Sequence, residues 1–166
     1  MKLIEDTYSQ MSLYFLKSIF HNVGVVLVGF AFAFLGTRLD LLFRIASFHS
    51  VPITVAASLL LTIGFLIRVW ATFDFYRQRM KVVSLVPQRK LITTGPYRFS
   101  RNPLYLGGNV FIFLGAVLVL GSPMGVLLTA LNIAIVDIMI RREEKQLQQV
   151  FGEEWIRYEK NVRRWL

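Results

Sequence analysis

Long runs of apolar residues alternate with short polar segments along this chain. Four runs carry little or no charge, and they cover roughly residues 20–36, 52–73, 104–120 and 124–140. An apolar run of about 18 residues or more can cross the hydrocarbon core of a bilayer as a helix, which satisfies its own backbone hydrogen bonds there. The pattern therefore predicts an all-α, polytopic membrane helical bundle of about four transmembrane helices.

Proline and glycine mark the ends of these runs. Pro52 and Pro103 suit the first turns of the second and third spans. The tight turn Gly121-Ser122-Pro123 makes the third and fourth spans a helical hairpin with almost no loop. The first ~16 residues alternate polar and apolar, which favours an interfacial helix or the wet start of the first span. The polar residues from Arg141 onward predict a cytoplasmic C-terminal helix.

Composition and charge fit a single membrane domain, residues 1–166. Hydrophobic residues make up 55% of the chain, and the net charge is +9. Seven Lys and Arg lie between the second and third spans and seven follow the fourth, whereas the third-to-fourth turn has none. This asymmetry predicts a multi-pass integral membrane protein with both termini cytoplasmic. We expect contact with membrane lipids and not with nucleic acid, because motifs that stack on bases or read grooves are absent.

Two residue types narrow the chemistry further. There are no cysteines, so disulfides, thiolate metal sites and cysteine nucleophiles are excluded. The two histidines, His21 and His49, are separated by a span, and no metal site is predicted. The N-terminal residues lack the pattern of a cleaved signal peptide.

Two polar segments emerge on one predicted side of the membrane. In residues 91–105, Gly95-Pro96 predicts a turn, and Asn102-Pro103 begins a helix whose free N–H groups favour an anion. Arg98 and Arg101 add positive charge, although Arg and Tyr at the end of a span are also routine interface anchors.

The second segment, residues 141–158, has helical periodicity. Glu143, Leu147, Phe151 and Trp155 fall on one stripe. We therefore expect the Glu143 carboxylate to point inward and to need a partner, with Glu144 close to the same face. The alternative is a solvated charged helix.

A few polar residues lie within the spans. Arg68 and Asp137 are near the predicted cytoplasmic ends, and Asn109 and Asn132 lie deeper. Such residues are functional candidates, but they can also pair with one another or reach the interface. Gly107-Gly108 is typical of close helix packing and not of a phosphate loop.

The two polar segments resemble those of a known superfamily. Its pattern is Leu-x-Thr-x-Gly-x-Tyr, then Arg-His/Asn-Pro-x-Tyr, a hydrophobic hairpin, Glu-Glu-x-x-Leu and Phe-Gly-Glu-Glu-Tyr-x-x-Tyr. The matching residues here are Leu91, Thr93, Gly95 and Tyr97; Arg101, Asn102, Pro103 and Tyr105; Glu143, Glu144 and Leu147; and Phe151-Gly152-Glu153-Glu154-Trp155 with Tyr158. The chain thus resembles the isoprenylcysteine carboxyl methyltransferase and phospholipid methyltransferase superfamily of integral-membrane enzymes over roughly its C-terminal half.

The resemblance implies S-adenosylmethionine as methyl donor and a lipophilic or lipidated acceptor, handled at the cytoplasmic face by a catalytic region of residues 87–166. It assigns catalytic roles to Arg101, Glu144 and Tyr105. Arg101 would hold a carboxylate of the donor or substrate, and Glu143 would accept from the donor's ammonium or ribose. Glu144 would orient Arg101 or act as a base. The implied cofactor-binding residues are Arg89, Leu91, Thr94, Gly95, Tyr97, Arg101, Asn102, Pro103, Tyr105, Glu143 and Glu144.

Two departures from the pattern bear on the acceptor. Arg89 stands where many members have His, and Asn102 stands where members often have His. An isoprenylcysteine carboxylate-like group and a phospholipid amine both remain candidates. The alternatives are a membrane NADPH-dependent sterol or enone reductase-like protein, which is usually a longer chain with more spans, and a noncatalytic membrane scaffold. The sequence does not predict the oligomeric state.

Overall fold

The structure, a computed structural model, describes residues 2–80, 82 and 90–166. These residues form helices, turns and connections, with no strand among them. By length and composition, four helical segments in the described residues can cross a membrane: 10–43, 51–77, 103–120 and 123–151. The predicted all-α membrane bundle is therefore confirmed.

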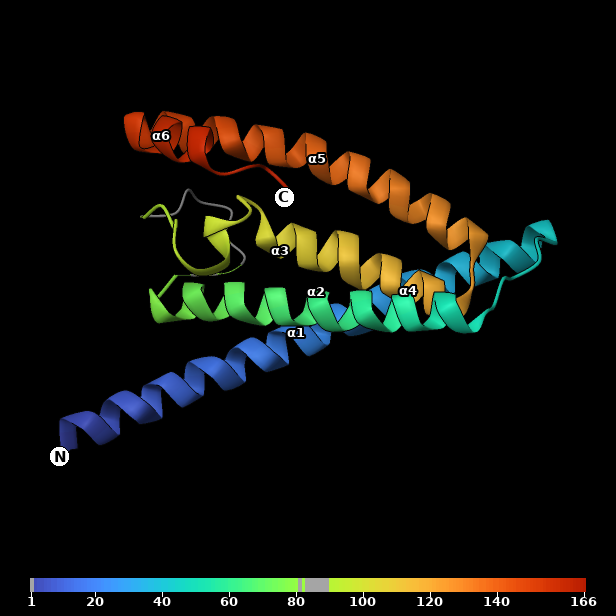
Figure 1. Cartoon of the computed structure of the whole chain (residues 1–166), viewed down its shortest axis with the longest axis horizontal. Coiled ribbons are helices and arrows are strands. Elements are labelled where there is room, and N and C mark those ends of the chain that lie inside the picture. The colour runs from blue at the N-terminus through green and yellow to red at the C-terminus, as the bar shows by residue number, and fades with distance from the viewer. Residues whose placement is uncertain (1, 81, 83–89) are drawn as a thin grey trace.

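The first helix is much longer than its apolar run. Helix α1 spans Lys2–Phe43 as one unit of 42 residues, about 63 Å at 1.5 Å per residue. Its N-terminal part extends beyond the other helices (Figure 1). The helix continues through polar positions because Ser18 and Asn22 are fully buried against α2, Val51–Arg77. Ser18 donates to the Val69 carbonyl at 2.7 Å, and Asn22 donates to Thr72 Oγ1 at 2.8 Å.

The second and third spans begin at the predicted prolines. Ser50 caps α2 through its side chain, and Pro52 follows in the first turn. The third span consists of α3 (Pro103–Tyr105), the π-helical segment η2 (Leu106–Ile112) and α4 (Phe113–Leu120). A Cβ on Gly64 would lie 2.6 Å from the Gly107 carbonyl oxygen. The two glycines therefore allow close backbone packing of α2 on η2.

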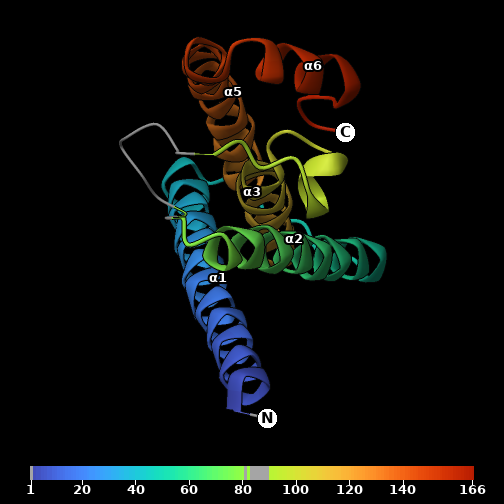
Figure 2. The same cartoon turned by 90° about the vertical axis from the view of Figure 1, so that its left-hand side faces the viewer.

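The predicted hairpin is also confirmed. Gly121 ends α4 with φ 61°, and Ser122 caps α5, Pro123–Phe151. Helix α5 continues without a break from the fourth span into the polar C-terminal region. A short helix, α6 (Glu153–Asn161), follows Gly152 and folds back beside the end of α5 (Figures 1 and 2).

One end of the bundle gathers the irregular and charged segments. The 3-10 turn η1 (Gly95–Arg98) lies between the end of α2 and the α5–α6 region (Figure 1). Leu91 packs there against Trp155 and Tyr158. Tyr158 also donates to the Tyr97 carbonyl at 2.7 Å. The two polar segments that the sequence singles out are therefore in contact.

Candidate functional site

The centre of this charged end is an ion pair between Arg101 and Glu144. Arg101 Nε donates to Glu144 Oε1 at 3.0 Å, and Nη2 lies 2.9 Å from the same oxygen. The side chains are 7% and 8% exposed, respectively. Removing one partner of a buried ion pair destabilises the protein strongly when the remaining charge has no other compensation.

Arg164 binds the other oxygen of Glu144. Its Nη2 and Nε lie 2.7 and 3.0 Å from Glu144 Oε2. These hydrogen bonds raise the pKa of the Arg164 guanidinium above its usual value. Sequence reasoning missed Arg164, because it lies beyond the last matched motif residue, Tyr158, and no local pattern marks it.

Protein groups surround the Arg101 guanidinium on every side. Nη1 donates to the Glu159 and Val162 carbonyls at 3.0 and 3.2 Å, and Nη2 lies 3.2 Å from Glu159 Oε1. The guanidinium carbon also lies 5.8 Å from the centre of the Trp155 ring. Since every nitrogen of the guanidinium already has a protein acceptor, Arg101 is best placed to join the loop, α5 and the C-terminal tail.

Glu143 differs from its neighbour and from expectation. The stripe of apolar residues predicted an inward Glu143, but this residue is exposed and Glu144 is the buried one. The inward orientation of Glu143 was therefore a wrong prediction. One hundred degrees of helix rotation separate the two residues, and contacts with Arg101 and Arg164 select Glu144 for burial. Glu143 does have a partner, since the Tyr105 hydroxyl donates to its Oε1 at 2.8 Å.

The turn before the third span is fitted tightly to the end of α2. Gly95 has φ +58°, and a Cβ at this position would clash with the Asp74 carboxylate. Asp74 is buried, and its Oδ2 has no hydrogen-bond partner among the described residues. Tyr97 is buried beside Ala71 and Phe75. Burial raises the pKa of its phenol well above the usual value, so the hydroxyl stays protonated.

The other predicted cofactor-binding residues have mixed surroundings. Asn102 donates through Nδ2 to the Arg164 carbonyl at 3.2 Å, and Pro103 is buried at the start of α3. Leu91 belongs to the apolar cluster under α6. Thr94 is exposed and makes no side-chain capping bond. Arg89 lies outside the described residues.

The polar residues within the spans also find partners. Asp137 accepts from Arg141 Nε at 2.8 Å and from Trp165 Nε1 at 3.3 Å. Asn109 Nδ2 lies 3.5 Å from Asn132 Oδ1 across the hairpin, whereas Asn132 Nδ2 is buried with no hydrogen-bond partner among the described residues. Arg68 Nε donates to Asn22 Oδ1 at 2.8 Å, so Arg68 ties α2 to α1.

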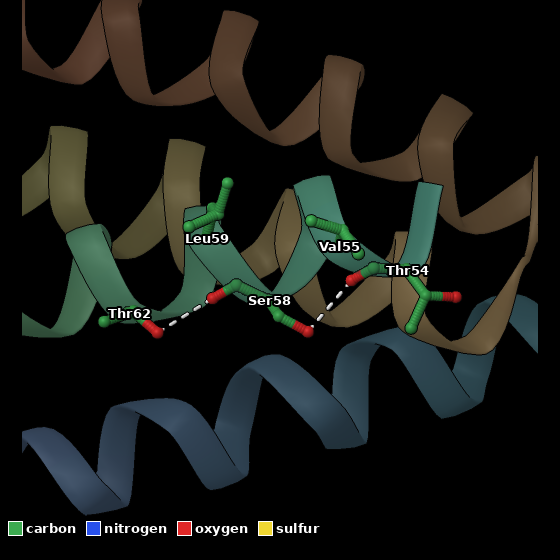
Figure 3. A pocket seen from close by; sticks show the side chains of 5 residues that line it. All are labelled: Thr54, Val55, Ser58, Leu59 and Thr62. Atoms are coloured by element: carbon green, nitrogen blue, oxygen red, sulfur yellow. Dashed lines mark hydrogen bonds between the residues drawn. The ribbon is translucent and has the colours of Figure 1, made fainter. Parts of the chain in front are cut away.

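A shallow hollow on α2 is a poor alternative site. It is lined by Thr54, Val55, Ser58, Leu59 and Thr62 (Figure 3). Each hydroxyl donates to the carbonyl four residues earlier in the helix, so these donors are already satisfied. The hollow lies toward the start of α2, whereas the loop before α3 and the α5–α6 region lie alongside its other end (Figure 1). We therefore place the candidate site at the charged cluster, which consists of Arg101, Glu144 and Arg164.

Fold and site together define an integral-membrane helical protein whose polar site is assembled where its spans end. A model of the phospholipid methyltransferase family matches residues 52–154. This match covers more than half of the chain, and the chain therefore belongs to that family of integral-membrane methyltransferases. No curated protein and no solved structure matches the chain.

Proposed function

We propose that this protein transfers a methyl group from S-adenosylmethionine to a lipophilic acceptor at the charged end of the bundle. The observation that carries the proposal is the ion pair between Arg101 and Glu144, which are 43 residues apart in the chain. Both residues fall inside the region that matches the family. The pair joins the loop before the hairpin to the helix after it.

The residues at this end fit the donor by charge. S-adenosylmethionine carries an ammonium, ribose hydroxyls, a carboxylate and a sulfonium that activates its methyl group. Glu143 is exposed, and its carboxylate is oriented by Tyr105; we assign it to the ammonium or the ribose. Arg101 is engaged by protein acceptors, so Arg98, which is exposed on η1, is the better partner for the carboxylate.

The two glutamates take different roles in this proposal. Both oxygens of Glu144 are bound by arginines, so Glu144 holds Arg101 and Arg164 in place and is poorly placed to accept a proton. Glu143 is accessible, and when it binds the ribose and not the ammonium, its second oxygen can serve as the base for an amine or thiol acceptor. A carboxylate acceptor needs no base. Positioning and exclusion of water then supply most of the catalysis.

We further propose that the charged end faces the cytoplasm, as the distribution of Lys and Arg predicts. Family membership favours a methyltransferase over the nicotinamide-dependent reductase and the noncatalytic scaffold. The acceptor is lipophilic in this proposal because the site adjoins helices that can cross a membrane.

Calorimetric titration of S-adenosylhomocysteine into the detergent-solubilised protein tests the donor. We expect binding in the wild type and at least roughly tenfold weaker binding in Glu143→Gln, because a hydrogen bond to a charged group contributes about 1.5–3 kcal/mol. Glu154→Gln is the matched control, since this exposed carboxylate lies at the start of α6. The proposal fails if a folded wild-type sample binds no S-adenosylhomocysteine, or if both variants bind like the wild type.

A further inference from the structure

Arg68 is a buried cation in the part of α2 that packs on the third span. It is 8% exposed. Its Nε donates to Asn22 Oδ1 at 2.8 Å, and Nη1 donates to the Leu104 carbonyl at 2.5 Å. Leu104 is the second residue of α3, so the guanidinium reaches the level at which the third span begins.

The surroundings hold this guanidinium in one orientation. The Asn22 amide nitrogen donates to the Ser18 carbonyl and to Thr72 Oγ1, both at 2.8 Å, which leaves the Asn22 oxygen facing Arg68. On the other side, a Cβ on Gly108 would lie 2.6 Å from Arg68 Nη1. The absence of side chains in Gly107-Gly108 therefore makes room for Arg68.

The positive charge of Arg68 has no acidic partner among the described residues. The described carboxylates that form ion pairs do so with other arginines, namely Arg77, Arg101, Arg141 and Arg164. Arg68 Nη2 donates to no described group, whereas Nε and Nη1 each have an acceptor. A buried guanidinium at membrane depth is costly unless an anion or hydrogen-bond acceptors compensate it.

Arg68 contacts a residue next to the candidate site. Leu104, whose carbonyl accepts from Arg68 Nη1, directly precedes Tyr105 and packs against the buried cluster that contains Tyr97. Tyr105 in turn donates to Glu143, the residue assigned above to the donor. An anion bound at Arg68 would thus lie on the membrane side of the residues proposed to bind the donor.

We propose that Arg68 binds an oxyanion, a carboxylate or a phosphate, carried by a membrane amphiphile. This part of the proposal rests on the proposed function: the amphiphile is the methyl acceptor. Arg68 then selects anionic acceptors over neutral ones. A guanidinium suits this role because its paired N–H donors match the oxygens of carboxylate and phosphate. The polar network from Ser18 to Arg68 sets the orientation of those donors before the ligand arrives.

The test compares lipids with one acyl chain and different head groups in a neutral detergent. The probes are oleoyl lysophosphatidate, oleate and monoolein, with binding measured by native mass spectrometry. We expect the wild type to prefer at least one anionic probe over monoolein by roughly tenfold or more, because hydrogen bonds to charged groups contribute about 1.5–3 kcal/mol. Arg68→Gln should abolish the preference and leave monoolein binding unchanged.

Arg38→Gln is the matched control, because it removes the same charge from an exposed position near the C-terminal end of α1. It should retain the preference. Arg68→Lys keeps the charge without the paired donors, and it should weaken anionic probes about threefold or more. The proposal is overturned if the wild type binds monoolein as well as the anionic probes, if both Arg68 variants keep the full preference, or if inorganic phosphate alone binds as tightly as the lipids.

Titration of S-adenosylhomocysteine into the same samples separates the two proposals. Binding of this nucleoside by both the wild type and Arg68→Gln supports the donor site independently of Arg68. If the nucleoside does not bind while anionic lipids still bind through Arg68, the anion site stands and the methyl-transfer proposal fails.

Discussion

Glu144 connects three separate parts of the chain at the scale of a single residue. It projects from α5, and its two oxygens bind Arg101 of the loop and Arg164 of the C-terminal tail. Backbone bonds reinforce the connection, since Arg101 N donates to the Arg163 carbonyl at 2.9 Å. The tail is therefore part of the site and not an appendage.

We predict that Glu144→Gln destabilises the protein by about 3 kcal/mol, because Arg101 and Arg164 lose their buried counter-charge and keep only the more exposed Glu159 and Asp137. Thermal unfolding in detergent measures the effect. Arg141→Gln is the control, since this arginine is 60% exposed and pairs only with Asp137 in the described region; it should change stability by no more than about 1 kcal/mol. A Glu144→Gln protein as stable as the control would contradict the proposed role of the pair.

Gly95 allows a second prediction at this scale. Gly95→Ala should cost about 1–3 kcal/mol, because an alanine there has a strained positive φ and its Cβ meets Asp74. Gly152→Ala is the comparison, with φ +50° and no atom within 4 Å of the added Cβ, so any loss there comes from backbone strain alone. Thermal unfolding of the two variants separates the steric term from backbone strain. Equal losses would show that the contact with Asp74 is unimportant.

The sequence singled out residues that the structure brings together at the candidate site, but it did not predict which glutamate is buried. Spacing and resemblance identified Arg101, Glu143 and Glu144. The buried position of Glu144 depends on Arg164, which is 20 residues away in the chain, and the local apolar stripe carries no information about it. Periodicity along one helix predicts which face of the helix is apolar. Which side chain at the edge of that face is buried depends on the residues that the rest of the fold packs against it.

The same reason explains which elements the sequence predicted well. The spans and the hairpin follow from local signals, namely apolar length, Pro52, Pro103 and Gly121-Ser122-Pro123. The full extent of α1 does not follow from local signals, because its polar residues suggest positions exposed to water. Ser18 and Asn22 are buried through Val69 and Thr72, which lie about fifty residues further along the chain.

The hairpin is fixed at the helix N-terminus of α5 by a residue of α1. Asp40 is buried, its Oδ2 accepts from the Ser122 hydroxyl at 2.5 Å, and its Oδ1 accepts from Met124 N at 2.9 Å. A carboxylate is favourable at a helix N-terminus, where free N–H groups carry positive partial charge. Helices α1 and α5 are therefore joined directly at this end.

We predict that Asp40→Ala costs about 2–4 kcal/mol, because it removes a charged acceptor from the buried Ser122 hydroxyl and the partly buried Met124 N–H. Ser50→Ala, which removes only the side-chain cap of α2, should cost about 1 kcal/mol. Unfolding midpoints in the same detergent give the comparison. An Asp40→Ala effect no larger than that of Ser50→Ala would show that the carboxylate adds nothing beyond an ordinary cap.

The whole molecule has its charged cluster at one end and the 44–50 connection and hairpin turn at the other, where Phe48 N donates to the Gly121 carbonyl at 2.9 Å. The proposed orientation can be tested because the chain has no cysteine. We expect Lys160→Cys to react with a membrane-impermeant maleimide only in opened cells, and Ser47→Cys to react in intact cells. Both positions are exposed. The reverse pattern would place the site on the outer face, and labelling of both from one side would contradict the four-span arrangement.

The unbroken course of α5 has a mechanical consequence. Its 29 residues form a rod of about 44 Å, clamped by Asp40 at one end and by the two arginines of Glu144 near the other. A bilayer whose thickness differs from the hydrophobic length of the bundle changes helix tilt. A rod fixed at both ends transmits that tilt to the ion pair, so turnover should depend on the acyl-chain length of the surrounding lipids, with a maximum where the bilayer matches the bundle.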